Sequence, residues 1–105
     1  MTVSEQMIKW MKDMWKYPRS LTGYGTRQTL EYLKKINPNL NIHSFKTGTK
    51  VFDWEIPDEW NIYDAYLEHE SGRRYAEFSS NNLHVLGYSI PCDINISLSE
   101  LLPHI

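Results

Sequence analysis

The sequence predicts an α+β fold with two N-terminal helices, then a small, mostly antiparallel β-rich part, and a short C-terminal helix. Apolar residues recur at helical spacing up to about residue 36, the period then changes to two, and Pro or Gly separates the segments. With 105 residues, 41% hydrophobic and 23% charged, the chain has the length and composition of one domain. We therefore expect a single domain, 1–105, with a helical segment at 1–38 and a β-rich accessory segment at 39–105.

The first helix is predicted over residues 3–16. Thr2 and Glu5 have the spacing of a capping box at its start. Pro18 stops it, because the residue before a proline is pushed out of the α region. The helix carries an apolar stripe of Val3, Met7, Met11, Met14 and Trp15. We interpret this stripe as core that needs a partner surface, which a chain of this length can supply only in part.

A loop with two glycines leads into the second helix, predicted over about residues 24–36. Gly23 and Gly25 stand where this helix begins, and two readings of them stay open. Their backbone N–H groups could bind an anion with Arg19 and Arg27 nearby. Alternatively, the turn simply requires a positive φ, which glycine adopts without steric cost.

Beyond residue 39 the sequence reads as strands followed by a short helix. A hairpin is expected around Ser71-Gly72. Ser97 is a typical N-cap for a last helix that Pro103 halts. The predicted strands cover residues 40–45, 51–54, 62–68, 74–78 and 83–88.

Charge and cysteine content exclude several classes of protein. Residues 1–50 hold nine Lys and Arg against three Asp and Glu (+6), and residues 51–105 hold two against ten (−8), which sum to −2. We expect the two halves to neutralise each other, and the acidic half disfavours nucleic-acid binding. A lone Cys92 excludes an internal disulfide. No apolar run is long enough for a membrane span, and no secretion signal is visible, so we expect a cytoplasmic protein.

The densest cluster of functional groups lies at residues 52–60. Its four carboxylates are Asp53, Glu55, Asp58 and Glu59, and they alternate with Trp54 and Trp60. Carboxylates beside an indole can serve as a general acid and base, because an apolar wall raises one pKa, and tryptophan faces suit stacking on sugars. A solvated run paired with neighbouring lysines is the alternative. The four histidines show no metal-ligand spacing.

Two segments resemble a known family. R-S-L-T-G-Y-G-T-R-Q-T-L (Arg19–Leu30) and G-T-K-V-F-D-W-E-I-P-D-E-W-N-I-Y-D-A-Y-L (Gly48–Leu67) are similar to motifs of bacterial aminopeptidase-like zinc proteins. These proteins are often encoded near polysaccharide-biosynthesis genes. N-L-H-V-L-G-Y-S-I-P (Asn82–Pro91) and L-S-E-L-L-P-H-I (Leu98–Ile105) follow the same pattern.

The resemblance implies a longer protein, in which a β-rich domain of unknown function is inserted into a zinc-peptidase-like domain. The family's metal-binding motif has no counterpart here, so the resemblance implies zinc only in the full-length protein and no catalytic or metal residue in this chain. We expect a fragment that helps to shape the substrate cleft. The alternative is a stand-alone module that binds a carbohydrate or another small ligand.

The expected partners are the remainder of the peptidase-like domain, or a second copy bound through an apolar surface. The loop 19–25 would orient an anionic end of the substrate. The residues expected nearest to substrate are Asp53, Trp54, Glu55, Glu59, Trp60, Arg19, Ser20, Thr22 and Gly23.

Overall fold

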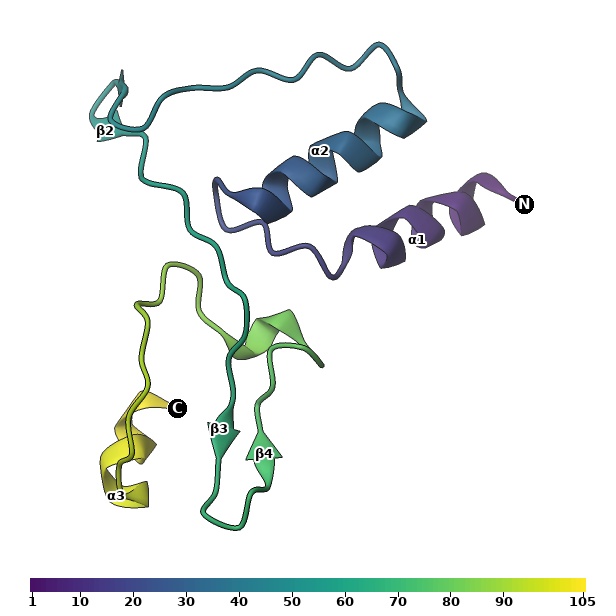
Figure 1. Cartoon of the computed structure of the whole chain (residues 1–105). Coiled ribbons are helices and arrows are strands. Elements are labelled where there is room, and N and C mark those ends of the chain that lie inside the picture. The colour runs from purple at the N-terminus through teal and green to yellow at the C-terminus, as the bar shows by residue number, and fades with distance from the viewer.

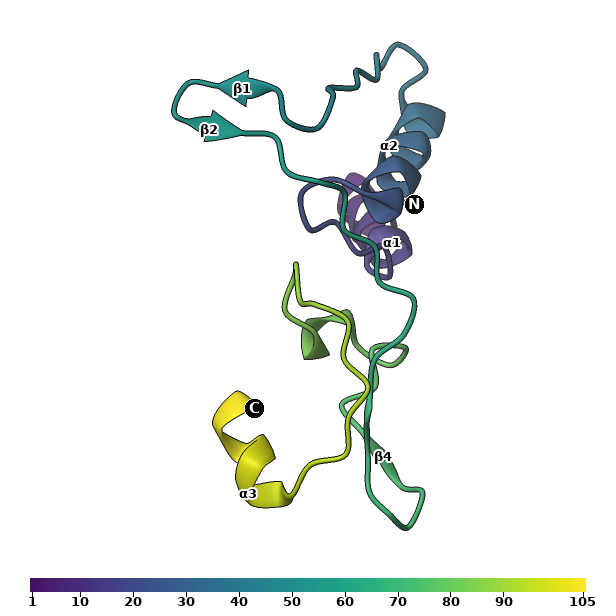
Figure 2. The same ribbon diagram turned by 60° about the vertical axis from the view of Figure 1, so that its left-hand side comes forward.

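A computed structural model describes residues 1–105 and confirms the α+β class. Two N-terminal helices lie side by side, and the rest of the chain forms two small hairpins joined by long irregular segments (Figures 1 and 2). The α-helices are α1 Val3–Met14, α2 Tyr24–Ile36 and α3 Leu98–Leu101, and the 3-10 helices are η1 Asn82–His84 and η2 Leu102–His104. The strands are β1 Lys50–Val51, β2 Trp54–Glu55, β3 Leu67–Glu68 and β4 Arg74–Tyr75.

The predicted capping box starts α1. The Glu5 N–H donates to Thr2 Oγ1 at 3.2 Å, and the Thr2 N–H donates back to the Glu5 carboxylate at 2.7 Å. The helix ends at Met14, two residues before the predicted end, and its last carbonyl accepts from the Arg19 guanidinium at 2.8 Å. A side chain from the following loop therefore satisfies a carbonyl at the open end of α1.

One polar contact ties α1 to α2. The Tyr32 hydroxyl donates to the Asp13 carboxylate at 2.5 Å, and Lys9 forms an ion pair with the same carboxylate. The hydrogen bond from Lys9, and then that from Tyr32, lower the pKa of Asp13. Both hydrogen bonds favour the charged form of the carboxylate, which contacts a residue of each helix.

The two hairpins account for all the β structure. β1 and β2 pair antiparallel with Val51 opposite Trp54, so Phe52 and Asp53 form the turn. The predicted single strand over 51–54 is therefore wrong, because a reversal of the chain falls inside it. The predicted hairpin around Ser71-Gly72 is confirmed, and Leu67 faces Tyr75 across it.

Other predicted strands are absent or shorter. Residues 40–45 have no ladder partner, and only the last two residues of the predicted strand 62–68 are paired. Residues 83–88 begin as the 3-10 helix η1, because the Asn81 side chain accepts from the Leu83 N–H at 3.0 Å and caps it. Alternation of apolar residues marks two faces of a strand, but a ladder also requires a neighbouring strand, which this chain does not place there.

The chain builds almost no core of its own. Only Gly23 and Gly25 are buried, and the accessible surface is 9240 Å², whereas a globular protein of this mass exposes about 6,200 Å². The radius of gyration is 17.9 Å, against about 13 Å for a compact domain of this length. Four of the five residues of the α1 stripe are exposed, with Met11 at 65%, and Met14 is half-buried. This chain alone therefore does not bury the stripe as core.

None of the helices has both the length and the apolar character that a membrane-spanning segment requires.

Candidate functional site

The loop before α2 and the end of the acidic, aromatic block meet in space. The backbone N–H of Trp60 donates to the Thr22 carbonyl at 3.2 Å, and the backbone N–H of Tyr24 donates to Asn61 Oδ1 at 2.7 Å. We call the surroundings, residues 19–27, 58–61 and 86–89, the junction. Several hydrogen bonds there join the helical segment to the rest of the chain.

Glycine is required in the junction by close packing. Gly23 has φ +152°, and a Cβ on it would lie 2.6 Å from the Trp60 carbonyl oxygen. A Cβ on Gly25 would lie 1.9 Å from the Pro18 carbonyl oxygen. The positive φ of Gly23 supports the turn reading of this residue. The Tyr24 N–H at the start of α2 is already taken by Asn61, so that donor is not available to an anion.

An ion pair crosses the junction between Arg27 on α2 and Glu59. Two guanidinium nitrogens face the two carboxylate oxygens, with the second pair at 3.2 Å. The hydrogen bond from Arg27 lowers the pKa of Glu59, and the same bond raises the pKa of Arg27. Because both groups satisfy each other, this arginine serves as a clamp rather than as a free anion ligand.

Within the junction, Trp60 also contacts residues 88 and 89. Its indole N–H donates to the Ser89 carbonyl at 2.9 Å, and its ring stacks on Tyr88 with centroids 6.0 Å apart. The Tyr88 hydroxyl in turn donates to the Asp58 carbonyl at 3.2 Å. Three separate segments are thus locked around one tryptophan.

The structure divides the residues expected nearest to substrate into two groups. Glu59, Trp60, Thr22 and Gly23 lie in the junction, together with Ser20, whose hydroxyl packs beside Gly87, and with Arg19. The Thr22 hydroxyl is buried there without a hydrogen-bond partner. The other group stands on the β1–β2 hairpin, away from the junction (Figure 1). It consists of Asp53, Trp54 and Glu55.

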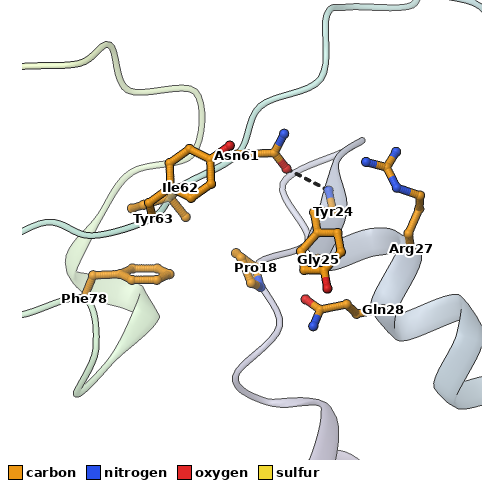
Figure 3. A pocket seen from close by; sticks show the side chains of 9 residues that line it. All are labelled: Pro18, Tyr24, Gly25, Arg27, Gln28, Asn61, Ile62, Tyr63 and Phe78. Carbon is orange, nitrogen blue, oxygen red and sulfur yellow. Dashed lines mark hydrogen bonds between the residues drawn. The ribbon is translucent and has the colours of Figure 1, made fainter.

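A pocket of about 570 Å³ opens next to the junction (Figure 3). Aromatic rings from Tyr24, Tyr63 and Phe78 share its lining with the amides of Gln28 and Asn61. Rings with a few polar groups suit a small ligand that has flat or apolar faces and hydrogen-bonding edges. The remaining lining residues are Pro18, Gly25, Arg27 and Ile62.

Sequence reasoning missed Tyr63, Phe78, Asn61 and Tyr88. The polar N–H of Trp60 indicates that a partner must exist, but no spacing in the sequence points to the Ser89 carbonyl, 29 residues away.

No group of three or more His, Cys, Asp or Glu side chains lies close enough together to hold a metal ion. Zinc sites in proteins are built from three or four such ligands around one point.

Residues 8–98 match the family described as a domain of unknown function, DUF4910, and the chain belongs to this family. It is 44% identical over 95 residues to a Clostridium acetobutylicum protein named "Putative polysaccharide biosynthesis protein with aminopeptidase-like domain". That alignment covers 90% of this chain and 22% of the relative.

A solved structure gives the same result. The crystal structure of a "putative peptidase" from Clostridium acetobutylicum superimposes with a TM-score of 0.89 at 42% identity, over 94% of this chain and 23% of that one. The resemblance to aminopeptidase-like proteins is therefore confirmed, and the chain is homologous to the N-terminal part of such a protein. It spans less than a quarter of the length of the relatives it matches.

Proposed function

We propose that residues 1–105 are the non-catalytic accessory part of an aminopeptidase-like zinc protein and form one wall of its substrate cleft. The observation that carries the proposal is the near absence of a core: only two residues are buried in a chain whose fold matches part of a larger peptidase-like structure. A fold of this shape leaves its apolar side chains to be covered by other parts of a protein.

In this proposal the junction is the rigid element that presents the cleft-facing residues. The Arg27–Glu59 pair and the Trp60 contacts hold the start of α2 against residues 58–61. The pocket beside them contributes polar groups such as Gln28 to substrate binding. The reacting groups and the zinc belong to the remainder of the protein.

The test compares this chain with a longer polypeptide that contains it. We expect the 105-residue chain to lack stoichiometric zinc after washing with a chelator, and to leave aminoacyl amides intact. In the longer polypeptide, Gln28→Leu is expected to raise KM severalfold with kcat unchanged, because only binding is lost. Glu68→Gln on β3 is the matched control. An unchanged KM for Gln28→Leu, or stoichiometric zinc on the short chain, contradicts the proposal.

The second candidate function is a module that binds a carbohydrate or similar small ligand, and the aromatic pocket favours it. Tyr63 and Phe78 offer ring faces beside the amide of Asn61. Saturation-transfer NMR with mono- and disaccharides is expected to show contact that Tyr63→Ala removes. Trp54→Ala on the β1–β2 hairpin is the control. Loss of binding in Trp54→Ala alone would place the ligand on that hairpin instead.

A further inference from the structure

The β1–β2 hairpin is a preformed arm. Its ladder is extended by the Gly48 N–H, which donates to the Ile56 carbonyl at 2.9 Å, and by the Ile56 N–H, which donates to the Thr49 carbonyl at 3.0 Å. The arm stands away from the two helices in both views (Figures 1 and 2). It therefore has a defined shape without packing on the rest of the chain.

The tip of this arm is an aromatic residue in an unfavourable setting. Phe52 has φ +55°, and the residue is fully exposed, at 102%. A two-residue turn with a positive φ at its first position favours glycine there, and a bulky residue in that region is strained by about 1–3 kcal/mol. Both the strain and the exposure are explained if the ring packs against another part of a longer protein.

We propose that Phe52 is a docking anchor, which inserts into an apolar pocket on the remaining part of the longer polypeptide. The proposal rests on the proposed function, because it takes that remainder as the occupant. Trp54, on β2 next to the turn, is 52% exposed and would flank the anchor. A central aromatic anchor in a rim of lesser contacts is the usual organisation of a tight protein contact.

The amount of uncovered surface favours this occupant over a second copy. The chain exposes 9240 Å², which exceeds the surface of a compact protein of its mass by roughly 3,000 Å². A dimer of standard size covers only about 800 Å² on each partner, so most of the excess would remain. A relative of which this chain matches only 22% has enough additional chain to cover it.

The experiment measures access to position 52 with a thiol reagent. Phe52→Cys and Glu70→Cys, the latter at the turn between β3 and β4, are each prepared in a Cys92→Ser background. Iodoacetamide labelling is followed by peptide mass spectrometry in the 105-residue chain and in the longer polypeptide. We expect labelling at position 52 to be at least tenfold slower in the longer polypeptide, at every protein concentration. Denaturant should restore the rate, and position 70 reports the general accessibility of a hairpin turn.

A second pair of variants tests the contribution of the Phe52 ring to stability without introducing a cysteine. Phe52→Gly is expected to lower the denaturation midpoint of the longer polypeptide by a few degrees, and not to lower that of the short chain. Ala76→Gly, which relieves a similar positive φ of +50° without removing an aromatic ring, should lower neither.

An equal labelling rate at position 52 in both proteins would overturn the proposal. So would protection that appears only as the concentration rises, because the occupant would then be a second copy. A protected position 52 together with an unchanged KM in Gln28→Leu would instead remove the cleft-wall role and leave the anchor standing.

Discussion

Single glycines decide whether the two halves of this chain can approach each other. Gly23 lies under the backbone of Trp60 and has a positive φ. Gly72, in the turn of the other hairpin, has φ +88° and no atom within 4 Å of an added Cβ. The two positions therefore share the backbone strain that a side chain would cause, but only Gly23 also has a close neighbour.

We expect Gly23→Ala to open the junction. Strain of about 1–3 kcal/mol and the clash with the Trp60 carbonyl add together, so hydrogen exchange of the Trp60 and Tyr24 N–H groups should become at least tenfold faster. Gly72→Ala is the control: it introduces backbone strain at a distant turn, and NMR measures its effect on the exchange rate of the same two amides. Equal effects of the two variants would show that the close approach at Gly23 is unimportant.

The Arg27–Glu59 pair gives the junction a defined acid sensitivity. The pKa of Glu59 is lowered from its ordinary value of 4.5, so its contribution to stability is fully present above pH 4.5 and is lost as the pH falls through the lowered pKa. The pKa values of Glu5, Asp13 and Glu100 are lowered as well, so a variant is needed to separate them.

In Glu59→Gln, we expect the junction to be less stable at pH 7 than in the wild-type protein. Its stability should also fall less as the pH is lowered. Tryptophan fluorescence between pH 7 and pH 3 is the measurement, because Trp60 adjoins the pair. Glu100→Gln, at the start of α3, is the control. A pH profile of Glu59→Gln that runs parallel to the unchanged one would exclude a role for the pair.

At the scale of elements, local signals predict the three α-helices to within two residues and one of the two hairpins, but they misplace or lengthen the other strands. A capping box is complete within four residues, so Thr2 and Ser97 can be recognised from sequence, and both caps are formed. A strand depends on a partner that the sequence does not name. For that reason the apolar pattern indicates strands where the structure has the turn at Phe52 and the 3-10 helix η1.

The site is predictable to the same limited degree. The motifs direct attention to residues 19–25 and 52–60, and the structure joins the first to the end of the second. The contacts that join them come from residues far apart in sequence. Asn61 caps α2 from outside the helix, 37 residues from Tyr24, and no periodic pattern carries that information.

The capping box of α1 is open to a direct test. Thr2→Ala removes the acceptor of the Glu5 N–H, and loss of such an N-cap costs about 1 kcal/mol. We expect the first turn of α1 to fray, with a fall in the far-UV circular dichroism signal at 222 nm. Glu5→Gln keeps the reciprocal hydrogen bond and should change the signal less. A larger loss in Glu5→Gln would mean that charge, and not capping, holds the turn.

Across the whole molecule, charge and apolar surface are arranged differently from a self-contained domain. The opposite charges of the two halves predict extensive pairing between them, yet one ion pair, Arg27–Glu59, joins them. The other two, Lys9–Asp13 and Arg74–Glu68, each lie within one half. Charge pairing between the two halves is thus confined to the junction, and it does not bring the rest of the two halves together.

Without a covering partner, the apolar stripe of α1 should make the 105-residue chain self-associate. Met7 and Met11 lie one turn apart and are 54% and 65% exposed, and apolar surface of this kind is favourably removed from water at about 25 cal/mol per Å². We expect the mass measured by sedimentation to rise with concentration. The double variant Met7→Gln and Met11→Gln should shift this rise to severalfold higher concentration, whereas Lys12→Gln should not.

The same stripe makes an opposite prediction for the longer polypeptide. If the remainder of the protein covers α1, the two glutamines introduce polar groups into a buried contact, which costs stability. The double variant should then lower the denaturation midpoint of the longer polypeptide while improving the behaviour of the short chain. A short chain that stays monomeric at all concentrations would show that the α1 stripe can remain exposed to solvent. Phe52 on the β1–β2 hairpin would then be the remaining argument for a covering partner.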